Sequence, residues 1–393
     1  MKTKIVLTQI MKNEAHVAER MLNSIKGFID AICLVDTGST DNTIEVVTKW
    51  ANENNVENYI FERPFDNFEN SRNFSINKAK EIFLTKNDDS TYYGFWLDFD
   101  EVLNISESFD KLKLDKDIYM VNTILNKMKY TRNELYRLDK PIFFYGAVHE
   151  YLVCKEKDIS ISSEIIKGIE VHVNMDGGSW KEDLSNKYIK HAHLLEQYIS
   201  ENRTDPRWIF YTAQSYHDSA SMKNNREENE ERLRRSLKYY KERVTRKDGY
   251  YEEIFYSQYR IAYIMDLIDE PWSLTNQEYL KAYNLDTLRA EPIKAIIDHY
   301  ISLNEWNLVY LYTKFGIDNF HMKNPYPKRL LFLDQSLYEW KFLESHSAAS
   351  FYTNKKQEAT YYFKQLVDIS IKKKELFTEN DLLKIERNKS YFI

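Results

Sequence analysis

Short apolar runs alternate with amphipathic segments over the first hundred residues. Four runs rich in β-branched and aromatic residues predict buried strands at 4–11, 31–35, 59–61 and 93–97. Between them, residues 15–25 and 44–54 carry apolar side chains at three- and four-residue steps, as an amphipathic helix does. Strands that alternate with helices predict a parallel sheet covered by helices.

The pattern changes after residue 118. Four strand-like runs at 118–126, 130–138, 141–154 and 168–174 follow one another without long helices between them, which predicts antiparallel strands added to the parallel sheet. Beyond Gly178 the helical spacing dominates, and seven of the nine glycines lie at or before that residue. We therefore expect a mixed α/β domain at 1–178 and an all-α domain at 179–393. Its predicted helices are 205–217, 227–244, 251–268, 277–283 and 291–303, with an amphipathic helical tail at 354–393.

Acidic residues follow three of the predicted strands. Glu14, Asp36 and Asp98 each come at or just after the end of an apolar run. The carboxyl ends of parallel strands meet at one edge of a sheet, where α/β proteins bind ligands, so this edge is a candidate nucleotide crevice. Asp98 and Asp100 are two positions apart, and two such carboxylates can share Mg²⁺ or Mn²⁺ that bridges to phosphates. An acidic turn after a strand is the alternative explanation.

Two histidines have open interpretations. His149 and Glu150 follow a small-residue turn, where they can supply a general base or form a strand-end ion pair. His172 lies alone in an apolar strand, where it is either a satisfied core residue or the completion of a metal site.

Composition narrows the class of protein. Charged residues make up 30% of the chain, the net charge is −6, and acidic and basic residues are interspersed. The chain has no long basic stripe, so nucleic acid is not an expected partner. No GxGxxG or GxxxxGK[ST] motif occurs, which argues against a dinucleotide site and a P-loop. No apolar stretch reaches the length of a membrane span, and no signal peptide is evident. Two cysteines in apolar runs fit a reducing compartment, so we predict a cytoplasmic location.

Five segments in order carry a family resemblance: IMKNE, LVDTGSTDNT, FDNFENSRN, WLDFDE and GAVHE. Together they resemble the motifs of family 2 glycosyltransferases with a GT-A fold. The most similar subgroup has tetratricopeptide-like helices after the catalytic domain and includes bacterial proteins and proteins of large DNA viruses, for which the location would be the host cytoplasm. The segments DPRWIFYTAQSYHD and YLKAYNLDTLRAEP resemble such repeats in degenerate form.

The resemblance implies roles for individual residues. The nucleoside pocket would be lined from the first strand by Thr8, Ile10, Lys12, Asn13 and Glu14, and Asp36 would help hold the uridine. Some relatives carry a second acid at the next position, which here is Thr37. The sugar-diphosphate region would contact Asp66, Arg72 and Asn73. The cation, Mn²⁺ or Mg²⁺, would be held by Asp98 and Asp100, with His172 as a third ligand. Glu150 or His149 would act as the base beside Asp100.

Three functional hypotheses follow. The first is a metal-dependent inverting glycosyltransferase that moves a sugar from a nucleotide donor, such as UDP-GlcNAc or UDP-glucose, to a glycan, peptide or small-molecule acceptor. The second is a helical-repeat interaction scaffold with an inactive sugar-nucleotide domain. The third is a metal-dependent nucleotidyltransferase or phosphoesterase. The face of a helical solenoid suits either of two roles for the helical half, which are presentation of the acceptor and formation of a homodimer.

Overall fold

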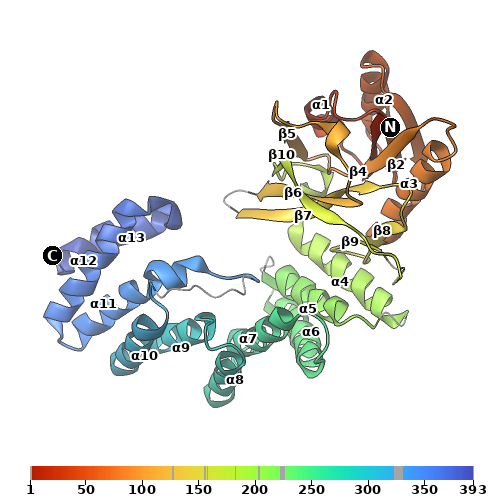
Figure 1. The fold of residues 1–393 in the computed structure, drawn as a ribbon. Helices are drawn as coiled ribbons and strands as arrows, with labels where there is room; N and C mark the ends of the chain where they lie inside the picture. Colours follow the sequence, from red (N-terminus) through yellow and green to blue (C-terminus); the bar gives the residue numbers. More distant parts are fainter. Residues whose placement is uncertain are drawn as a thin grey trace. The chain divides into compact units, whose positions relative to one another are not determined.

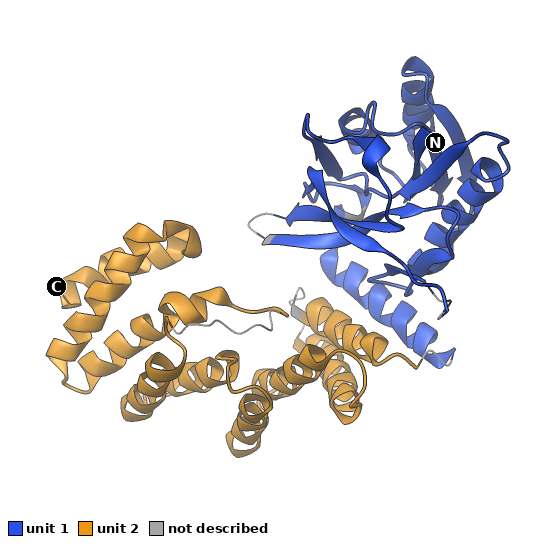
Figure 2. Cartoon of the chain, viewed as in Figure 1, with its two compact units in different colours: residues 1–202 blue, residues 203–393 orange. Residues whose placement is uncertain are grey.

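Two compact units make up the chain, residues 1–202 and 203–393 (Figure 2). This computed structural model describes residues 2–125, 128–154, 156, 158–181, 183–201, 204–221, 226–322 and 331–392. The division falls after helix α4 (Leu184–Ser200), whereas the sequence predicts a joint at residue 178. Helix α4 groups with the N-terminal unit because its Tyr198 is buried there and its hydroxyl donates a hydrogen bond to Glu69.

The N-terminal unit alternates strands and helices before it becomes strand-rich (Figure 1). In chain order its other elements are β1 Lys2–Met11, α1 Ala15–Ser24, β2 Ala31–Asp36, α2 Thr43–Glu53, β3 Glu57–Glu62, α3 Phe68–Phe83, β4 Ser90–Phe95, β5 Glu101–Ile105, η1 Lys111–Lys113, β6 Ile118–Leu125, β7 Met128–Arg137, β8 Ile142–Tyr145, β9 Tyr151–Cys154, β10 Ser163–Val173 and η2 Gly178–Trp180.

Eight strands form one mixed sheet in the order β3-β2-β1-β4-β7-β6-β10-β5. The pairs β3–β2, β2–β1, β1–β4 and β6–β10 are parallel, and β4–β7, β7–β6 and β10–β5 are antiparallel. The predicted fold class, a mainly parallel mixed sheet followed by helices, is therefore confirmed. Strand β5, which pairs at the sheet edge, was not predicted.

The predicted strand 141–154 is wrong as a single strand. It is split into β8 and β9, which form a separate two-stranded antiparallel sheet. Gly146 lies at the turn with φ +120°, a backbone conformation that favours glycine and ends the extended run. The connection between the two strands, residues 146–150, carries His149 and Glu150.

Both faces of the large sheet are covered, since successive side chains of a strand point to opposite faces. Ile5 and Leu7 of β1 pack with apolar residues of α1 and α2, whereas Val6 packs with Ile76 and Phe83 of α3 on the other face. This sandwich fixes the carboxyl ends of β1, β2 and β4 relative to the N-terminal end of α3.

All the elements of the C-terminal unit within its described residues are helices, and successive helices pack on one another (Figure 1). Its elements are α5 Pro206–Ser221, α6 Arg226–Thr245, α7 Tyr251–Leu267, α8 Trp272–Leu285, α9 Glu291–Ser302, α10 Trp306–Asn319, η3 Leu337–Lys341, α11 Phe342–Tyr352, α12 Lys356–Lys372, η4 Lys374–Leu376 and α13 Glu379–Phe392. The five helices predicted between residues 205 and 303 are confirmed, and the tail predicted as helix is interrupted near Lys373.

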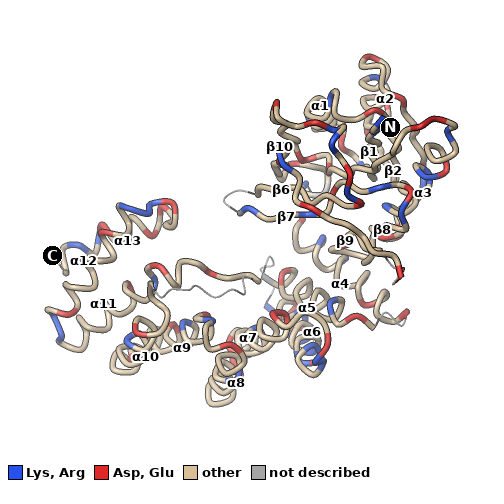
Figure 3. The backbone as a smooth tube through the Cα atoms, in the orientation of Figure 1, with Lys and Arg blue, Asp and Glu red and all other residues tan. Residues whose placement is uncertain are grey.

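Charges of both signs are interspersed along both units, as the sequence indicated (Figure 3). Within the described ranges, no helix is both long and apolar enough to cross a membrane.

Candidate functional site

A cavity of about 880 Å³ lies in the N-terminal unit, at the carboxyl ends of β1 and β4. Its lining comes from the tip after β1, the segment after β4, the start of α3, strand β7, the 146–150 connection and α4. The predicted site residues found in this lining are Ile10, Lys12, Asn13, Glu14, Arg72, Asp98, Asp100, His149 and Glu150. Residues far apart in the sequence therefore meet as the sheet topology predicts.

Arg72 is the central cation of the cavity. It is buried, and its Nη2 lies 2.9 Å from Asp98 Oδ1 while its Nε lies 2.6 Å from Glu150 Oε1. The guanidinium stacks over Trp96, with 4.8 Å to the ring centroid. The partial burial of Asp98 opposes its ionisation, but the nearby guanidinium groups of Arg72 and Arg132 outweigh this effect and lower the pKa of that carboxyl. Arg72 thus holds Asp98 ionised beside the predicted base.

The remaining carboxylates around Asp98 repel one another. Burial, and then the charges of Asp100 and Asp98, raise the pKa of Glu14 to about 7. Burial and the Asp98 charge also raise the pKa of Asp100, whose Oδ2 accepts a hydrogen bond of 2.8 Å from Trp180 Nε1. A group of acids that disfavour one another's ionisation fits a divalent cation, because the cation would neutralise their charge.

No group of three His, Cys, Asp or Glu side chains is arranged to hold a metal ion among the residues that the structure describes. Asp98 and Asp100 offer two anchoring carboxylates, and the hydrogen bonds that the Asp98 side chain accepts from Gln9 and Arg72 both go to its Oδ1. The side chain of Asp98 is 38% exposed. The donor set therefore fits a Mg²⁺ or Mn²⁺ ion that takes its other ligands from water and substrate phosphates.

Strand β7 contributes a second ionic group that the sequence analysis missed. Arg132 donates two hydrogen bonds to Glu101, of 2.8 and 2.9 Å, and one of 2.7 Å to Glu134. Burial raises the pKa of Glu101 to about 7 and that of Glu134 to about 8, although Arg132 opposes both shifts. Tyr130 and Arg132 line the cavity, and the alternation of Tyr130, Arg132 and Glu134 on one strand face was the available sequence signal.

Asp36 lies next to the cavity at the end of β2. Its Oδ1 accepts hydrogen bonds from the backbone amides of Gly38, at 2.9 Å, and Ser39, at 2.8 Å. Its Oδ2 is buried and has no hydrogen-bond partner in the described part of the chain. The adjacent Thr37 lines the cavity. A buried carboxylate oxygen without a donor fits a ligand that supplies an N–H group there.

Four other predicted site residues lie outside the cavity lining, and the roles of all the predicted site residues stay predictions. The hydroxyl of Thr8 is buried 2.6 Å from the hydroxyl of Tyr136. Asp66 accepts hydrogen bonds from Arg63 and Asn70. His172 lies in β10, opposite Val102 and Ile124 of the neighbouring strands. Asn73 bonds to the backbone of β8.

The segment from Gly177 to Leu194 also lines the cavity, although the sequence predicted it to be an interdomain joint followed by a helix of the second domain. It contributes Gly177, Gly178, Trp180, Lys187, Lys190, His191 and Leu194. Its helical pattern identifies a buried face but not the surface against which that face packs, so no sequence signal could place it here.

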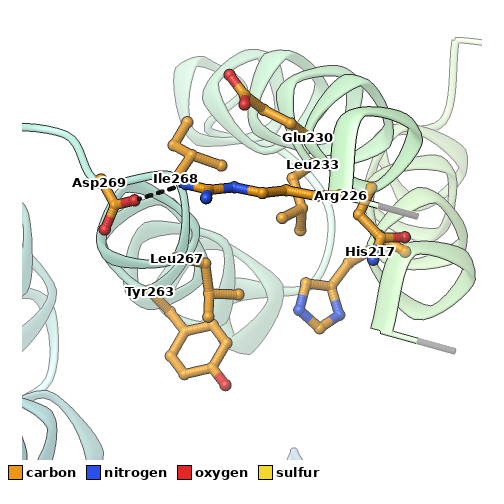
Figure 4. A pocket seen from close by; sticks show the side chains of 10 residues that line it. His217, Arg226, Glu230, Leu233, Tyr263, Leu267, Ile268 and Asp269 are labelled. Atoms are coloured by element: carbon orange, nitrogen blue, oxygen red, sulfur yellow. Dashed lines mark ion pairs between the residues drawn. The ribbon is translucent and has the colours of Figure 1, made fainter. Parts of the chain in front are cut away.

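A second cavity, of about 480 Å³, lies within the C-terminal unit among α5, α6 and α7 (Figure 4). Its lining includes His217, the apolar side chains of Leu233 and Leu267, and an ion pair between Arg226 and Asp269. Both members of that pair are largely exposed and 3.5 Å apart. The described residues that line this cavity include no group of buried acids and arginines like the one around Asp98, so we place the candidate site in the N-terminal unit.

Comparison with known proteins identifies the class of this unit. Residues 10–142 match the family model described as glycosyl transferase family 2. Four of the five motif segments lie within this range, and the fifth, GAVHE, begins four residues after it. The cavity is built largely from the same range. The N-terminal unit is therefore a family 2 glycosyltransferase domain, as the motifs predicted.

Two curated relatives are glycosyltransferases. The SPbeta prophage-derived glycosyltransferase SunS of Bacillus subtilis (strain 168) and glycosyltransferase SunS of Bacillus phage SPbeta are each 21% identical to this chain over 221 residues. The match covers 53% of this chain and 48% of each relative, so the chain spans about half the length of the curated relatives it matches.

Solved structures with some similarity include S. aureus TarS 1–349 in complex with UDP-GlcNAc and in complex with UDP. Each is 13% identical to this chain and has a TM-score of 0.36. The match covers 68% of this chain and 89% of the TarS chain. A TM-score of this size is too low to transfer any property to this chain.

Proposed function

We propose that this chain is a metal-assisted, inverting glycosyltransferase that uses a nucleotide sugar, with UDP as the nucleotide. The observation that carries the proposal is the convergence of Asp98, Asp100, Arg72 and Glu150 on one cavity of a family 2 domain. The donor would be a sugar such as UDP-GlcNAc or UDP-glucose, and the acceptor a glycan, peptide or small molecule.

Transfer requires that a diphosphate leave while an acceptor hydroxyl attacks. A divalent cation, Mn²⁺ or Mg²⁺, held by Asp98 and Asp100 would offset the negative charge of the departing diphosphate. Arg72 keeps Asp98 ionised for this task, since its Nη2 lies 2.9 Å from Asp98 Oδ1. Its own positive charge would also help to offset the charge of the departing diphosphate.

The second requirement is removal of the proton from the attacking acceptor hydroxyl. The acceptor oxygen bonds to the anomeric carbon, the bond from that carbon to the phosphate oxygen breaks, and the hydroxyl proton passes to a carboxylate. Glu150 fits this role because it lines the cavity and burial raises its pKa, although Arg72 opposes the shift. Attack from the face opposite the leaving group gives inversion. His149, in a left-handed conformation with φ +55°, is the other candidate base.

Uridine recognition is supported by Asp36. The buried Oδ2 of Asp36 needs a donor, and the uracil ring carries an N–H group. Replacing Asp36 by asparagine tests this directly, because the amide keeps an oxygen for the Gly38 and Ser39 bonds and turns Oδ2 into a donor. We expect Asp36→Asn to weaken UDP binding about tenfold or more.

Calorimetric titration with UDP, with and without Mn²⁺, followed by a turnover screen over UDP- and GDP-sugars, tests the proposal. We expect UDP binding that strengthens with Mn²⁺ and release of UDP from one donor. An inactive scaffold would give no turnover, and a nucleotidyltransferase or phosphoesterase would release pyrophosphate or phosphate. Either result would reject the glycosyltransferase assignment.

Three further features stay predictions. They are the cytoplasmic location, the tetratricopeptide-like character of the helical half, and the use of that half to present the acceptor or form a homodimer. Absence of nucleic-acid binding is predicted from the interspersed charges (Figure 3).

A further inference from the structure

Helix α3 makes several hydrogen bonds to residues 144–150, the segment that carries the predicted base. The Asn73 side chain accepts a hydrogen bond of 2.8 Å from the backbone amide of Phe144 and donates one of 2.9 Å to its carbonyl. The backbone amide of Phe68 donates to the carbonyl of Ala147 at 3.1 Å. Residues of a helix three or four positions apart share a face, so Glu69, Arg72 and Asn73 of α3 lie together beside this segment, and Phe68 contacts it from the first turn of the helix.

Glu69 supplies the middle of this support. It is buried, and its Oε2 accepts a hydrogen bond of 2.6 Å from the backbone amide of Gly146. The same oxygen accepts a hydrogen bond from the hydroxyl of Tyr198, which is buried near the end of α4. Two donors from different elements thus meet on one carboxylate oxygen.

The segment needs such support because β8 and β9 pair only with each other in the described sheets. An isolated two-stranded hairpin is marginally stable in water. Its connection also contains Gly146 with φ +120° and His149 with φ +55°, a conformation that costs energy for a residue other than glycine. Outside contacts must therefore fix residues 144–150.

We propose that Glu69 and Tyr198 are positioning residues that lock the 144–150 segment onto α3 and so hold Glu150 at the cavity; this rests on the proposed function for its catalytic consequence. Tyr198 makes α4 part of the active-site support. Arg72, on the same face of α3, completes the arrangement through its 2.6 Å contact with Glu150.

Two substitutions test the lock. Tyr198→Phe removes only the hydroxyl. Glu69→Gln keeps the size of the side chain and one oxygen that can accept both hydrogen bonds, but it removes the carboxylate charge that makes each of these bonds roughly twice as strong as a neutral one. Tyr93→Phe is the matched control, because this buried tyrosine in the same unit donates a 2.8 Å hydrogen bond to the Lys116 carbonyl, away from the cavity.

The first measurement is hydrogen exchange of the Gly146 and Phe144 amides. We expect exchange about tenfold faster in Tyr198→Phe and Glu69→Gln, the effect of about one lost hydrogen bond, and unchanged exchange in the control. Unchanged exchange in Tyr198→Phe, the milder variant, would overturn the lock whatever the activity of the protein.

The second measurement is turnover of the nucleotide sugar. We expect kcat to fall about tenfold in Tyr198→Phe while the Kd for UDP stays within about twofold of wild type, because the lock positions Glu150 and not the nucleotide. Faster exchange with wild-type kcat would overturn the positioning role. A wild-type protein that turns over no sugar nucleotide would reject the proposed function instead, and the exchange measurement would still decide whether the lock exists.

Discussion

Replacing Gly178 by alanine is expected to weaken nucleotide binding more than it weakens the fold. A Cβ on this residue would lie 2.8 Å from the Lys12 carbonyl oxygen, 3.0 Å from that of Asn13 and 3.2 Å from Glu14 Oε1. These three residues form the tip after β1, and all line the cavity. The Gly178 amide also donates a 2.9 Å hydrogen bond to Glu14 Oε2, so the two segments cannot simply separate.

The size of the effect follows from this geometry. Carbon–oxygen contacts are ordinarily about 3.3–3.6 Å, so the tip must move by about 0.5 Å to accept the methyl group. Forcing an extra methyl group into a packed site costs about 1–3 kcal/mol. If the displaced tip must return to its original position to bind UDP, this energy is lost from binding, and affinity falls by about 5- to 150-fold.

Calorimetry with UDP and Mn²⁺ measures the affinity for UDP, and thermal unfolding measures the stability of the fold. Gly27→Ala is the control: its Cβ would meet no atom within 4 Å, but its φ of +77° strains alanine. We expect the control to lose about 1–2 kcal/mol of stability and to bind UDP as the wild type does. Wild-type UDP affinity in Gly178→Ala would show that the β1 tip does not contact the nucleotide, and the reasoning would fail.

Three more predictions concern single groups. Asp98→Asn should lower metal-dependent turnover by about a hundredfold or more, because the cation loses a charged ligand; wild-type activity with unchanged Mn²⁺ dependence would reject the metal assignment. Burial raises the pKa of the Cys33 thiol to about 12, so this thiol should not react with an alkylating reagent at pH 8. The folded protein should therefore take up one equivalent of the reagent, at the half-buried Cys154, and the unfolded protein two. Uptake of two equivalents by the folded protein would contradict this prediction. Burial raises the pKa of Glu134 from 4.5 to about 8 despite Arg132, so the folded protein keeps a proton that the unfolded chain releases, and stability should fall as pH rises from about 4.5 to 8. Glu134→Gln should flatten the dependence of Tm on pH over that range, and an unchanged slope would show that another group causes it.

The large sheet could be predicted because several of its strands are apolar runs, and the polar residues that follow these runs mark where each strand ends. The runs that became β1, β2 and β4 are buried on both faces, and the topology then brings their ends together without any further information. Asp98, Glu14 and Asp36 were therefore predictable neighbours. Strand β5 was missed because its five residues include only two buried side chains, too few for a periodic pattern.

Contacts between distant segments could not be predicted. The run 141–154 is apolar on both sides of Gly146, and an apolar run has no signal for the strand with which it pairs. The spacing of apolar residues in α4 shows which face is buried, and the surface that covers this face is determined by Glu69 and Phe68 of α3, more than a hundred residues earlier. The glycine pair 177–178 predicts a turn, but its close packing on Lys12 and Asp100 depends on the tertiary fold.

The motif FDNFENSRN shows why a motif identifies a family more securely than it assigns a contact. Asp66, Arg72 and Asn73 were all expected at the sugar diphosphate, yet only Arg72 among them lines the cavity. Both polar groups of the Asn73 amide bond to the backbone of Phe144, so a ligand would have to compete with two hydrogen bonds to reach them. Sequence preserves no distinction between a side chain that contacts a substrate and one that holds the contacting residue in place, because both demand a specific residue at a specific position. If Asn73 supports the 144–150 segment, Asn73→Ala should lower kcat and speed exchange of the Phe144 amide while UDP affinity is unchanged; a loss of UDP affinity with unchanged exchange would instead return Asn73 to the donor site.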